Sequence, residues 1–326
     1  MQFEMFLQST ALILAEGAIY ERLRRHPAIA FDPHLAHATL IYDPASAKIL
    51  AQLYGEYLDI GQKHQLPMVV STPTWRANQD RLDHSAFKGC RINQDNARFL
   101  ADIRAGYRAS GPPIFIGGLL GPRGDAYRPE EALSTKEACS FHSDQIEALA
   151  ETEVDFLYAT TLPAFSEACG IAVAMAKTAL PYIVSFVIRG NGTLLDGTPL
   201  SQAIEQIDTL VARPPTGYAV NCVHPTILLT GLARTELERR SLAKRIVGFA
   251  ANTSAKSPEE LDGLAELDTQ EPDRFAELMA AVYEQYHISI LGGCCGTGTD
   301  HIECLATQLK ADAQSGKTVQ HLDPPS

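Results

Sequence analysis

Two consecutive cysteines in a glycine-rich segment are the residues best suited to chemistry in this sequence. Cys294 and Cys295 lie in GGCCGT (residues 292–297), directly after an apolar run, and Cys222 ends a second apolar run, YAVNC (residues 218–222). Thiolates are ligands that Zn²⁺ accepts readily, and three of them with a fourth position open make a catalytic zinc site. We therefore predict that Cys222, Cys294 and Cys295 bind one zinc ion.

A zinc ion with three thiolate ligands carries a net charge of about −1, so it activates water poorly. It still binds a fourth thiol and lowers the pKa of that thiol, which suits alkyl transfer to a thiol substrate. Hydrolytic zinc sites use histidine and carboxylate ligands more often. A zinc-dependent hydrolase or lyase, and a non-catalytic zinc- or thiol-binding protein, stay as alternatives. His224, two residues after Cys222, is an alternative ligand.

Eight short, nearly continuous apolar runs recur along the chain and predict parallel strands that are buried on both faces. They cover residues 11–17, 68–72, 114–118, 154–160, 182–188, 218–222, 245–251 and 288–293. Longer segments between and after them predict helices. These cover residues 45–64, 93–109, 134–151, 164–179, 199–211, 226–243, 272–286 and 299–311. A strand followed by a helix, eight times over, predicts an α/β fold: a single (β/α)₈ TIM barrel.

We expect residues 1–326 to form one barrel domain, with a frayed tail from about residue 313. The polar segment 252–272 predicts a long loop after the seventh strand. The alternative fold is an open, doubly wound sheet. No GxGxxG motif follows the first apolar run, which weakens the dinucleotide-binding form of that alternative.

The charge balance limits the classes of partner. The 326 residues include 27 Lys and Arg against 39 Asp and Glu, a net charge of −12. Nucleic-acid binding proteins need a basic surface, and an anionic membrane would repel this chain. No apolar run is long enough to span a bilayer. Seven cysteines without a secretion signal predict reduced thiols and a cytoplasmic protein. The sequence leaves the oligomeric state open, a homo-oligomer included.

Polar residues at the ends of the predicted strands are candidates for substrate binding, because barrel enzymes build their sites at the carboxyl ends of their strands. These candidates are Glu16, Gly17, Thr72, Thr74, Trp75, Thr160, Asn221 and Asn252. An acid at a strand end must be paired or used, which singles out Glu16. Trp75, with Tyr20 and Tyr127, would offer aromatic faces to a cationic alkyl donor.

Several of these motifs resemble the homocysteine S-methyltransferase family, over about residues 10–312. The resemblance is carried by GGCCGT at 292–297, Asn221-Cys222, AEGA at 15–18, TLP at 161–163, DGTP at 196–199 and Asn252. It implies zinc held by Cys222, Cys294 and Cys295, with the homocysteine sulfur as fourth ligand. It further implies that a small-molecule donor passes a methyl group to that sulfur and gives methionine. A sulfonium such as S-methylmethionine is the first expectation for the donor.

The sequence departs from the family pattern at several positions. The aspartate of the first strand is Glu16 here, and Ala251 stands where a proline precedes Asn252. The glutamate of the fourth strand, which in the family helps to hold the amino group of homocysteine, is Thr160. Either Glu16 or another acid, such as Asp125 or Glu167, replaces that contact, or the acceptor is a different thiol.

Overall fold

Eight parallel strands close into one barrel in the computed structural model, and each strand pairs with its neighbours in chain order. The structure describes all residues except 1, 10–11, 108–110, 235–243, 257–267 and 315–326. The strands are β1 Ile13–Ala15, β2 Met68–Ser71, β3 Ile114–Leu120, β4 Phe156–Leu162, β5 Tyr182–Phe186, β6 Gly217–Val223, β7 Ile246–Ala251 and β8 Ile290–Gly293. The predicted TIM barrel is therefore confirmed.

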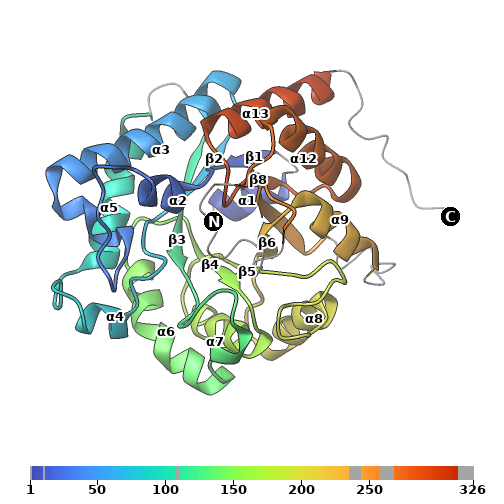
Figure 1. The fold of residues 1–326 in the computed structure, drawn as a ribbon. Coiled ribbons are helices and arrows are strands. Elements are labelled where there is room, and N and C mark those ends of the chain that lie inside the picture. Colours follow the sequence, from blue (N-terminus) through green and yellow to red (C-terminus); the bar gives the residue numbers. More distant parts are fainter. Residues whose placement is uncertain (1, 10–11, 108–110, 235–243, 257–267, 315–326) are drawn as a thin grey trace.

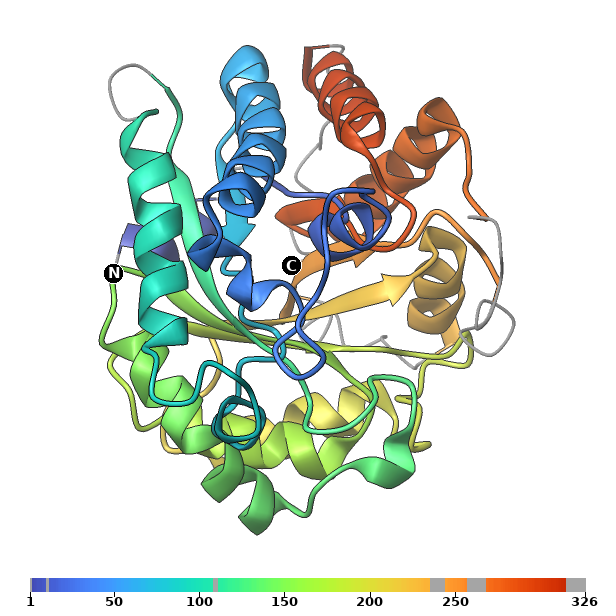
Figure 2. The same ribbon diagram turned by 60° about the vertical axis from the view of Figure 1, so that its left-hand side comes forward.

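Helices surround the ring of strands in both views (Figures 1 and 2). They are α1 Gln2–Gln8, α2 Ile19–Arg24, α3 Pro44–His64, α4 Gln79–Asp83, α5 Ile92–Ala105, α6 Thr135–Ala150, α7 Phe165–Met175, α8 Leu200–Leu210, α9 Pro225–Arg234, α12 Pro272–Tyr286 and α13 Thr299–Gln314. Two 3₁₀ helices, His37–Tyr42 and Pro129–Glu131, lie in the connections. No helix among these described residues is both long enough and apolar enough to cross a membrane.

Each predicted strand and helix is present among the described residues, with small differences at its ends. The structure also has helices that the sequence did not predict, namely α1, α2, α4 and the two 3₁₀ helices. Helix α13 continues to Gln314, beyond the predicted end at residue 311. The second half of the predicted helix 226–243, much of the predicted loop 252–272 and most of the predicted frayed tail lie outside the described residues. That the whole chain forms a single domain stays a prediction.

Local chemistry explains where the main helices begin. Asp43 caps α3 by accepting a hydrogen bond from the backbone N–H of Ser46, and Pro44 occupies the first helical turn. Ser134 and Glu137 form a reciprocal capping box at the start of α6, as their spacing indicates. These caps satisfy N–H groups that the helices themselves leave without partners.

Helix α1 closes the amino-terminal end of the barrel. Its Phe3 is 1% exposed and packs with the first residues of several strands. The Phe3 ring stacks on Phe156 with centroids 4.2 Å apart and meets Phe115 edge-on at 5.3 Å. Aromatic packing of this kind adds to the burial of apolar area. The barrel is thus filled at this end, which leaves the carboxyl ends of the strands for a site.

We predict that Phe3→Ala lowers the free energy of unfolding by about 3–5 kcal/mol, because it empties a packed layer of the barrel. Urea denaturation followed by circular dichroism measures the change. Met5→Ala is the matched control, since Met5 lies on the same helix and is 70% exposed. Equal losses in the two variants would contradict a plugging role for α1.

Candidate active site

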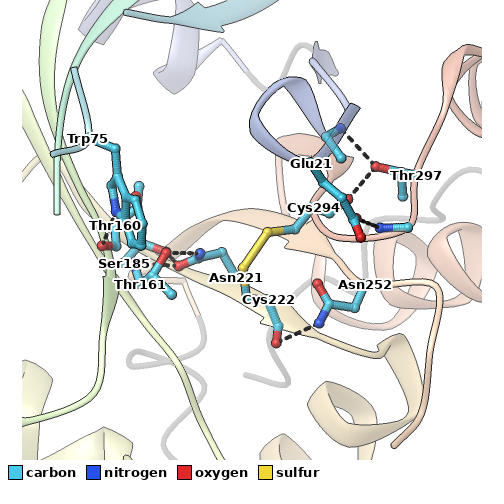
Figure 3. The surroundings of a disulfide bond; sticks show 12 residues. Glu21, Trp75, Thr160, Thr161, Ser185, Asn221, Cys222, Asn252, Cys294 and Thr297 are labelled. Atoms are coloured by element: carbon cyan, nitrogen blue, oxygen red, sulfur yellow. Dashed lines mark hydrogen bonds between the residues drawn. A yellow bond between two sulfur atoms is a disulfide. The ribbon is translucent and has the colours of Figure 1, made fainter. Parts of the chain in front are cut away.

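The three cysteines singled out above lie together at the carboxyl ends of β6 and β8. The sulfur atoms of Cys222, Cys294 and Cys295 are all within 4.8 Å of one another, a group that could hold a metal ion. Cys222 and Cys294 are joined in a disulfide, with Cα atoms 5.5 Å apart (Figure 3). Cys295 is a free thiol. We call these three residues the cysteine cluster.

An unusual backbone conformation carries Cys222 into this cluster. In a regular strand, neighbouring side chains point to opposite faces. Cys222 instead has φ of +55°, and the register between β6 and β7 shifts at this point. Thr161 at the end of β4 also has a positive φ, +62°, which is rare for a β-branched residue. Strain of this kind persists only where surrounding contacts hold it in place.

The side chain of Asn221 supplies those contacts. Its Oδ1 accepts hydrogen bonds from the Thr161 backbone N–H at 3.0 Å and from the Ser185 hydroxyl at 2.6 Å. Its Nδ2 donates to Thr161 Oγ1 at 2.8 Å, so one amide links β4, β5 and β6 (Figure 3). Asn221 was expected to contact substrate, yet most of its hydrogen-bonding capacity is used inside the protein. Its geometry is that of a support for Cys222.

The cysteine doublet sits in a tight turn after β8. The Cys294 carbonyl accepts hydrogen bonds from both the backbone N–H and the hydroxyl of Thr297. Gly296 has φ of +84°, and its N–H donates to Glu21 Oε2 at 2.5 Å. Gly293, by contrast, lies in the regular strand, and a Cβ there would clash with the Thr297 side chain. Gly296 therefore provides the left-handed turn after β8, and Gly293 is needed for close packing against Thr297.

A cavity of about 1170 Å³ opens beside the cysteine cluster. Seven of the eight expected substrate-binding residues lie on its wall: Glu16, Gly17, Thr72, Trp75, Thr160, Asn221 and Asn252. Thr74 does not, because it lies behind the wall and its hydroxyl donates to the Leu119 carbonyl at 2.6 Å. The cavity is larger than the roughly 300–1,000 Å³ of ordinary ligand pockets.

Glu16 is a buried carboxyl group on the cavity wall. Its Oε1 accepts a hydrogen bond from the Ser71 backbone N–H at 3.0 Å. Oε2 has no hydrogen-bond partner among the described residues. Burial raises the pKa of Glu16 to about 8, although the Ser71 contact acts in the opposite direction. One oxygen of this carboxyl group is therefore buried without a hydrogen-bond partner among the described residues.

Trp75 and Thr160 make one continuous part of the wall. The indole Nε1 of Trp75 donates to the Thr160 carbonyl at 3.3 Å (Figure 3). One face of the indole is covered by the Arg76 guanidinium, whose carbon lies 4.2 Å from the ring centroid. Tyr20 approaches the indole edge-on at 6.1 Å. Because Arg76 already occupies that indole face, only the rest of Trp75, with Tyr20 and Tyr127, is left for a cationic ligand.

Two other residues weighed from the sequence lie elsewhere. His224 contacts Thr226 through Nδ1 and Gln270 through Nε2, and it is not in the cysteine cluster. Glu167 is completely buried and is absent from the cavity wall, whereas Asp125 is on it. Of the three acids considered to replace the family glutamate, Glu16 and Asp125 are therefore the ones that reach the cavity.

Some wall residues were not predicted. They include Glu21, Arg24, Ser71, Arg189, Ser254 and Asp268. Glu21 lies in the first turn of α2, and its contact with Gly296 spans 275 residues of sequence. Such pairings have no local sequence signal. The one available indication was that these residues lie at or after the carboxyl ends of predicted strands.

Fold and site together define a class: a barrel protein with a thiol cluster and a large cavity at the carboxyl ends of its strands. The homocysteine S-methyltransferase family matches residues 13–309 of the chain. The protein therefore belongs to this family of methyltransferase enzymes.

Known relatives fit this assignment. S-methylmethionine–homocysteine S-methyltransferase BHMT2 from Pongo abelii is 22% identical over 93% of this chain and 80% of its own length. A methionine synthase from Mycobacterium leprae is 29% identical over 42% of this chain, a match that spans 11% of that longer protein. The homocysteine methyltransferase MmuM from Escherichia coli shares the fold. The oxidized form of MmuM matches with a TM-score of 0.68 and 21% sequence identity, over 93% of this chain and 96% of that chain. The metallated form matches with a TM-score of 0.67 and 19% sequence identity, over 93% of this chain and 98% of that chain.

We predict that Asn221→Ala destabilises the protein by about 2–4 kcal/mol, since it leaves the buried Thr161 N–H and Ser185 hydroxyl without an acceptor. The variant should also bind less metal per chain, because the hydrogen bonds that fix the backbone next to Cys222 to β4 and β5 are then lost. Urea denaturation and elemental analysis measure the two effects. Asn221→Asp, which keeps the acceptor oxygen, should lose less. Full metal binding by Asn221→Ala would refute the supporting role.

The raised pKa of Glu16 predicts that the stability of the protein depends on pH. A glutamate is deprotonated above about pH 4.3 in the unfolded chain. The folded protein holds the proton up to about pH 8, so this contribution to stability is full below pH 4.3 and is lost as the pH rises through 8. Relative to the reduced, metal-free wild type, Glu16→Gln should therefore lose less Tm between pH 5 and pH 8. Glu277→Gln, at an exposed site, is the control; a Glu16→Gln profile parallel to wild type would contradict the assignment.

Proposed function

We propose that this enzyme transfers a methyl group to the sulfur of homocysteine and so forms methionine, with zinc bound by Cys222, Cys294 and Cys295. The single observation that carries the proposal is the meeting of three cysteine sulfurs beside a cavity large enough for two small substrates. Membership in the homocysteine S-methyltransferase family supports homocysteine as the acceptor.

The donor set suits zinc. Zn²⁺ binds thiolates at about 2.3 Å in tetrahedral geometry, and sulfurs within 4.8 Å of one another are compatible with one shared ion. The Cys222–Cys294 disulfide is an alternative state of two of these sulfurs, because only reduced, deprotonated cysteines bind the metal. A reducing compartment such as the cytoplasm would keep the cluster in its metal-binding state. A metallated form is also known for the MmuM enzyme.

The residues around the cysteine cluster have separate roles in binding the substrates and in supporting the site. Bound zinc would supply a coordination site that favours the thiolate of homocysteine at neutral pH. Glu16 offers its unpaired Oε2 to the ammonium group, and loses its proton as the cation arrives. Asn252 donates to the Cys222 carbonyl at 3.0 Å and keeps the end of β6 in place. The cavity wall holds the two substrates at reacting distance.

The methyl donor we propose is a small sulfonium such as S-methylmethionine. The homocysteine sulfur forms a bond to the methyl carbon, the carbon–sulfonium bond breaks, and its electron pair stays with the donor sulfur. The thiol proton leaves, so homocysteine and S-methylmethionine give two molecules of methionine. Trp75, Tyr20 and Tyr127 on the wall offer aromatic surface to the positive charge. The relative BHMT2 carries S-methylmethionine in its name.

The proposal predicts that the protein is active only when its cysteines are reduced and zinc is bound. Protein reduced with a phosphine and loaded with Zn²⁺ should bind one ion per chain and form methionine from homocysteine and S-methylmethionine. Oxidised protein, or reduced protein treated with a chelator, should lose at least about 100-fold in rate, because the thiol acceptor is then not activated. Mass spectrometry of methionine formed from a deuterated methyl donor measures the transfer.

Cys295→Ser and Cys304→Ser make a matched pair. The first removes a member of the cluster, whereas Cys304 is a free cysteine on α13 outside it. Loss of both metal and activity in Cys295→Ser alone is the expected result. Activity that survives complete metal removal would reject the mechanism. Ester or amide hydrolysis would favour a hydrolase, and zinc binding without any turnover a non-catalytic zinc protein.

A further inference from the structure

The segment between β3 and α6 supplies a large part of the cavity wall. Six consecutive residues line the cavity: Asp125, Ala126, Tyr127, Arg128, Pro129 and Glu130. We call residues 121–131 the rim segment. It belongs to neither a strand nor an α-helix, so its position relative to the cysteine cluster must be set by contacts from outside it.

A buried pair of titratable residues reaches this segment from behind. His142 on α6 and Glu167 on α7 are both 0% exposed, and His142 Nε2 lies 2.9 Å from Glu167 Oε1. The same Oε1 accepts a hydrogen bond from the backbone N–H of Arg123 at 2.8 Å. Neither His142 nor Glu167 lines the cavity. The pair therefore connects two outer helices to the first turn of the rim segment.

Neighbouring residues bind the next positions of the segment from the β2 side. The Arg76 guanidinium donates to the carbonyls of Pro122 at 3.4 Å and Gly124 at 2.5 Å. The Gly121 N–H donates to the Trp75 carbonyl at 3.0 Å, and a Cβ on Gly121 would lie 2.4 Å from the indole nitrogen. The backbone from 121 to 124 is thus held at every residue, and it touches the only tryptophan of the chain.

Burying His142 and Glu167 lowers the stability of the fold. A carboxyl group and an imidazole lose their hydration in the interior, and here Glu167 Oε2 and His142 Nδ1 have no hydrogen-bond partner among the described residues. An apolar pair of similar volume would pack α6 against α7 at no such cost. What an apolar pair could not do is accept the Arg123 N–H, which is the contact that reaches the rim segment.

We propose that Glu167 and His142 are positioning residues for the reaction: they hold the rim segment so that Tyr127 and the edge of Trp75 form the wall that receives the methyl donor. The acceptor side of the cavity, with Glu16 and Asn252, is built on β1 and β7 and does not depend on the pair. Substitution of the pair therefore weakens donor binding selectively. The part of this inference that concerns the donor rests on the proposed function.

The chain contains a matched control for this pair. At the opposite end of β3, Asp155 Oδ2 accepts the Ile116 N–H at 2.7 Å and binds Arg104 at 2.6 Å. It repeats the chemistry of Glu167, a carboxylate that joins a backbone N–H to a cationic or imidazole side chain. Asp155 does not line the cavity, and β3 ends before the rim segment begins. Asp155→Asn should therefore cost stability without altering the donor wall.

The test compares Glu167→Ala, Glu167→Gln and Asp155→Asn in full-length, reduced, zinc-loaded protein. Because Trp75 is the only tryptophan, its emission and its quenching by acrylamide report the rim segment directly, with or without turnover. Glu167→Ala should shift the emission to longer wavelength and raise the quenching constant. It should also raise the KM for S-methylmethionine about 10-fold, with the KM for homocysteine and the bound zinc unchanged. Glu167→Gln, which keeps a carbonyl acceptor for the Arg123 N–H, should stay near wild type in both readouts.

Two outcomes overturn the inference. One is a Glu167→Ala variant that loses stability as Asp155→Asn does but keeps wild-type Trp75 emission and quenching. The other is an equal rise in the KM of both substrates. If Glu167→Ala does not fold, Glu167→Met, which fills the same space but cannot accept the Arg123 N–H, takes its place with the same expected direction. If the wild type shows no methyl transfer, the proposed function fails, and the fluorescence comparison still decides whether the pair positions the rim segment.

Discussion

Everything in the site depends on the meeting of sulfur atoms from two strands that are not adjacent in the barrel. Cys222 belongs to β6, and the doublet follows β8, so β7 separates them. A regular strand could not aim Cys222 at the doublet while Asn221 binds Thr161 and Ser185. The left-handed backbone at Cys222 resolves this conflict, and the hydrogen bonds of Asn221 stabilise it. The reactive geometry is therefore built from strain that a neighbouring amide holds in place.

Two kinds of contact hold the residues at the carboxyl ends of the strands in place. On one side, Glu16, Asn252 and the cysteine doublet directly follow β1, β7 and β8, and backbone hydrogen bonds such as Cys294 N–H to the Ala251 carbonyl tie these strand ends together. On the other side, the wall is a long segment whose position depends on side chains from outside it. A barrel allows this division because each loop can vary while the ring of strands stays closed.

Apolar packing and polar chemistry occupy opposite ends of the molecule. Helix α1 fills the amino-terminal end with aromatic rings, and the carboxyl-terminal end holds a buried acid, unpaired polar oxygens and thiols. Groups of the second kind destabilise a fold, since each is desolvated without a full set of partners. The closed barrel and its filled floor offset that cost. A site with a raised glutamate pKa can then exist in a stable protein.

The sequence by itself determined the barrel, because eight buried apolar runs alternating with helices leave few other arrangements, and it singled out the cysteine cluster from residue type and spacing. It also placed Glu16 and Thr160 at strand ends. Only the tertiary structure decided that Thr74 lies behind the wall, that Asn221 supports Cys222, that Arg76 covers one face of Trp75 and that Glu167 is buried against His142. Those outcomes follow from hydrogen bonds between residues far apart in the chain and from local departures in φ, which neither hydrophobic periodicity nor motif spacing encodes.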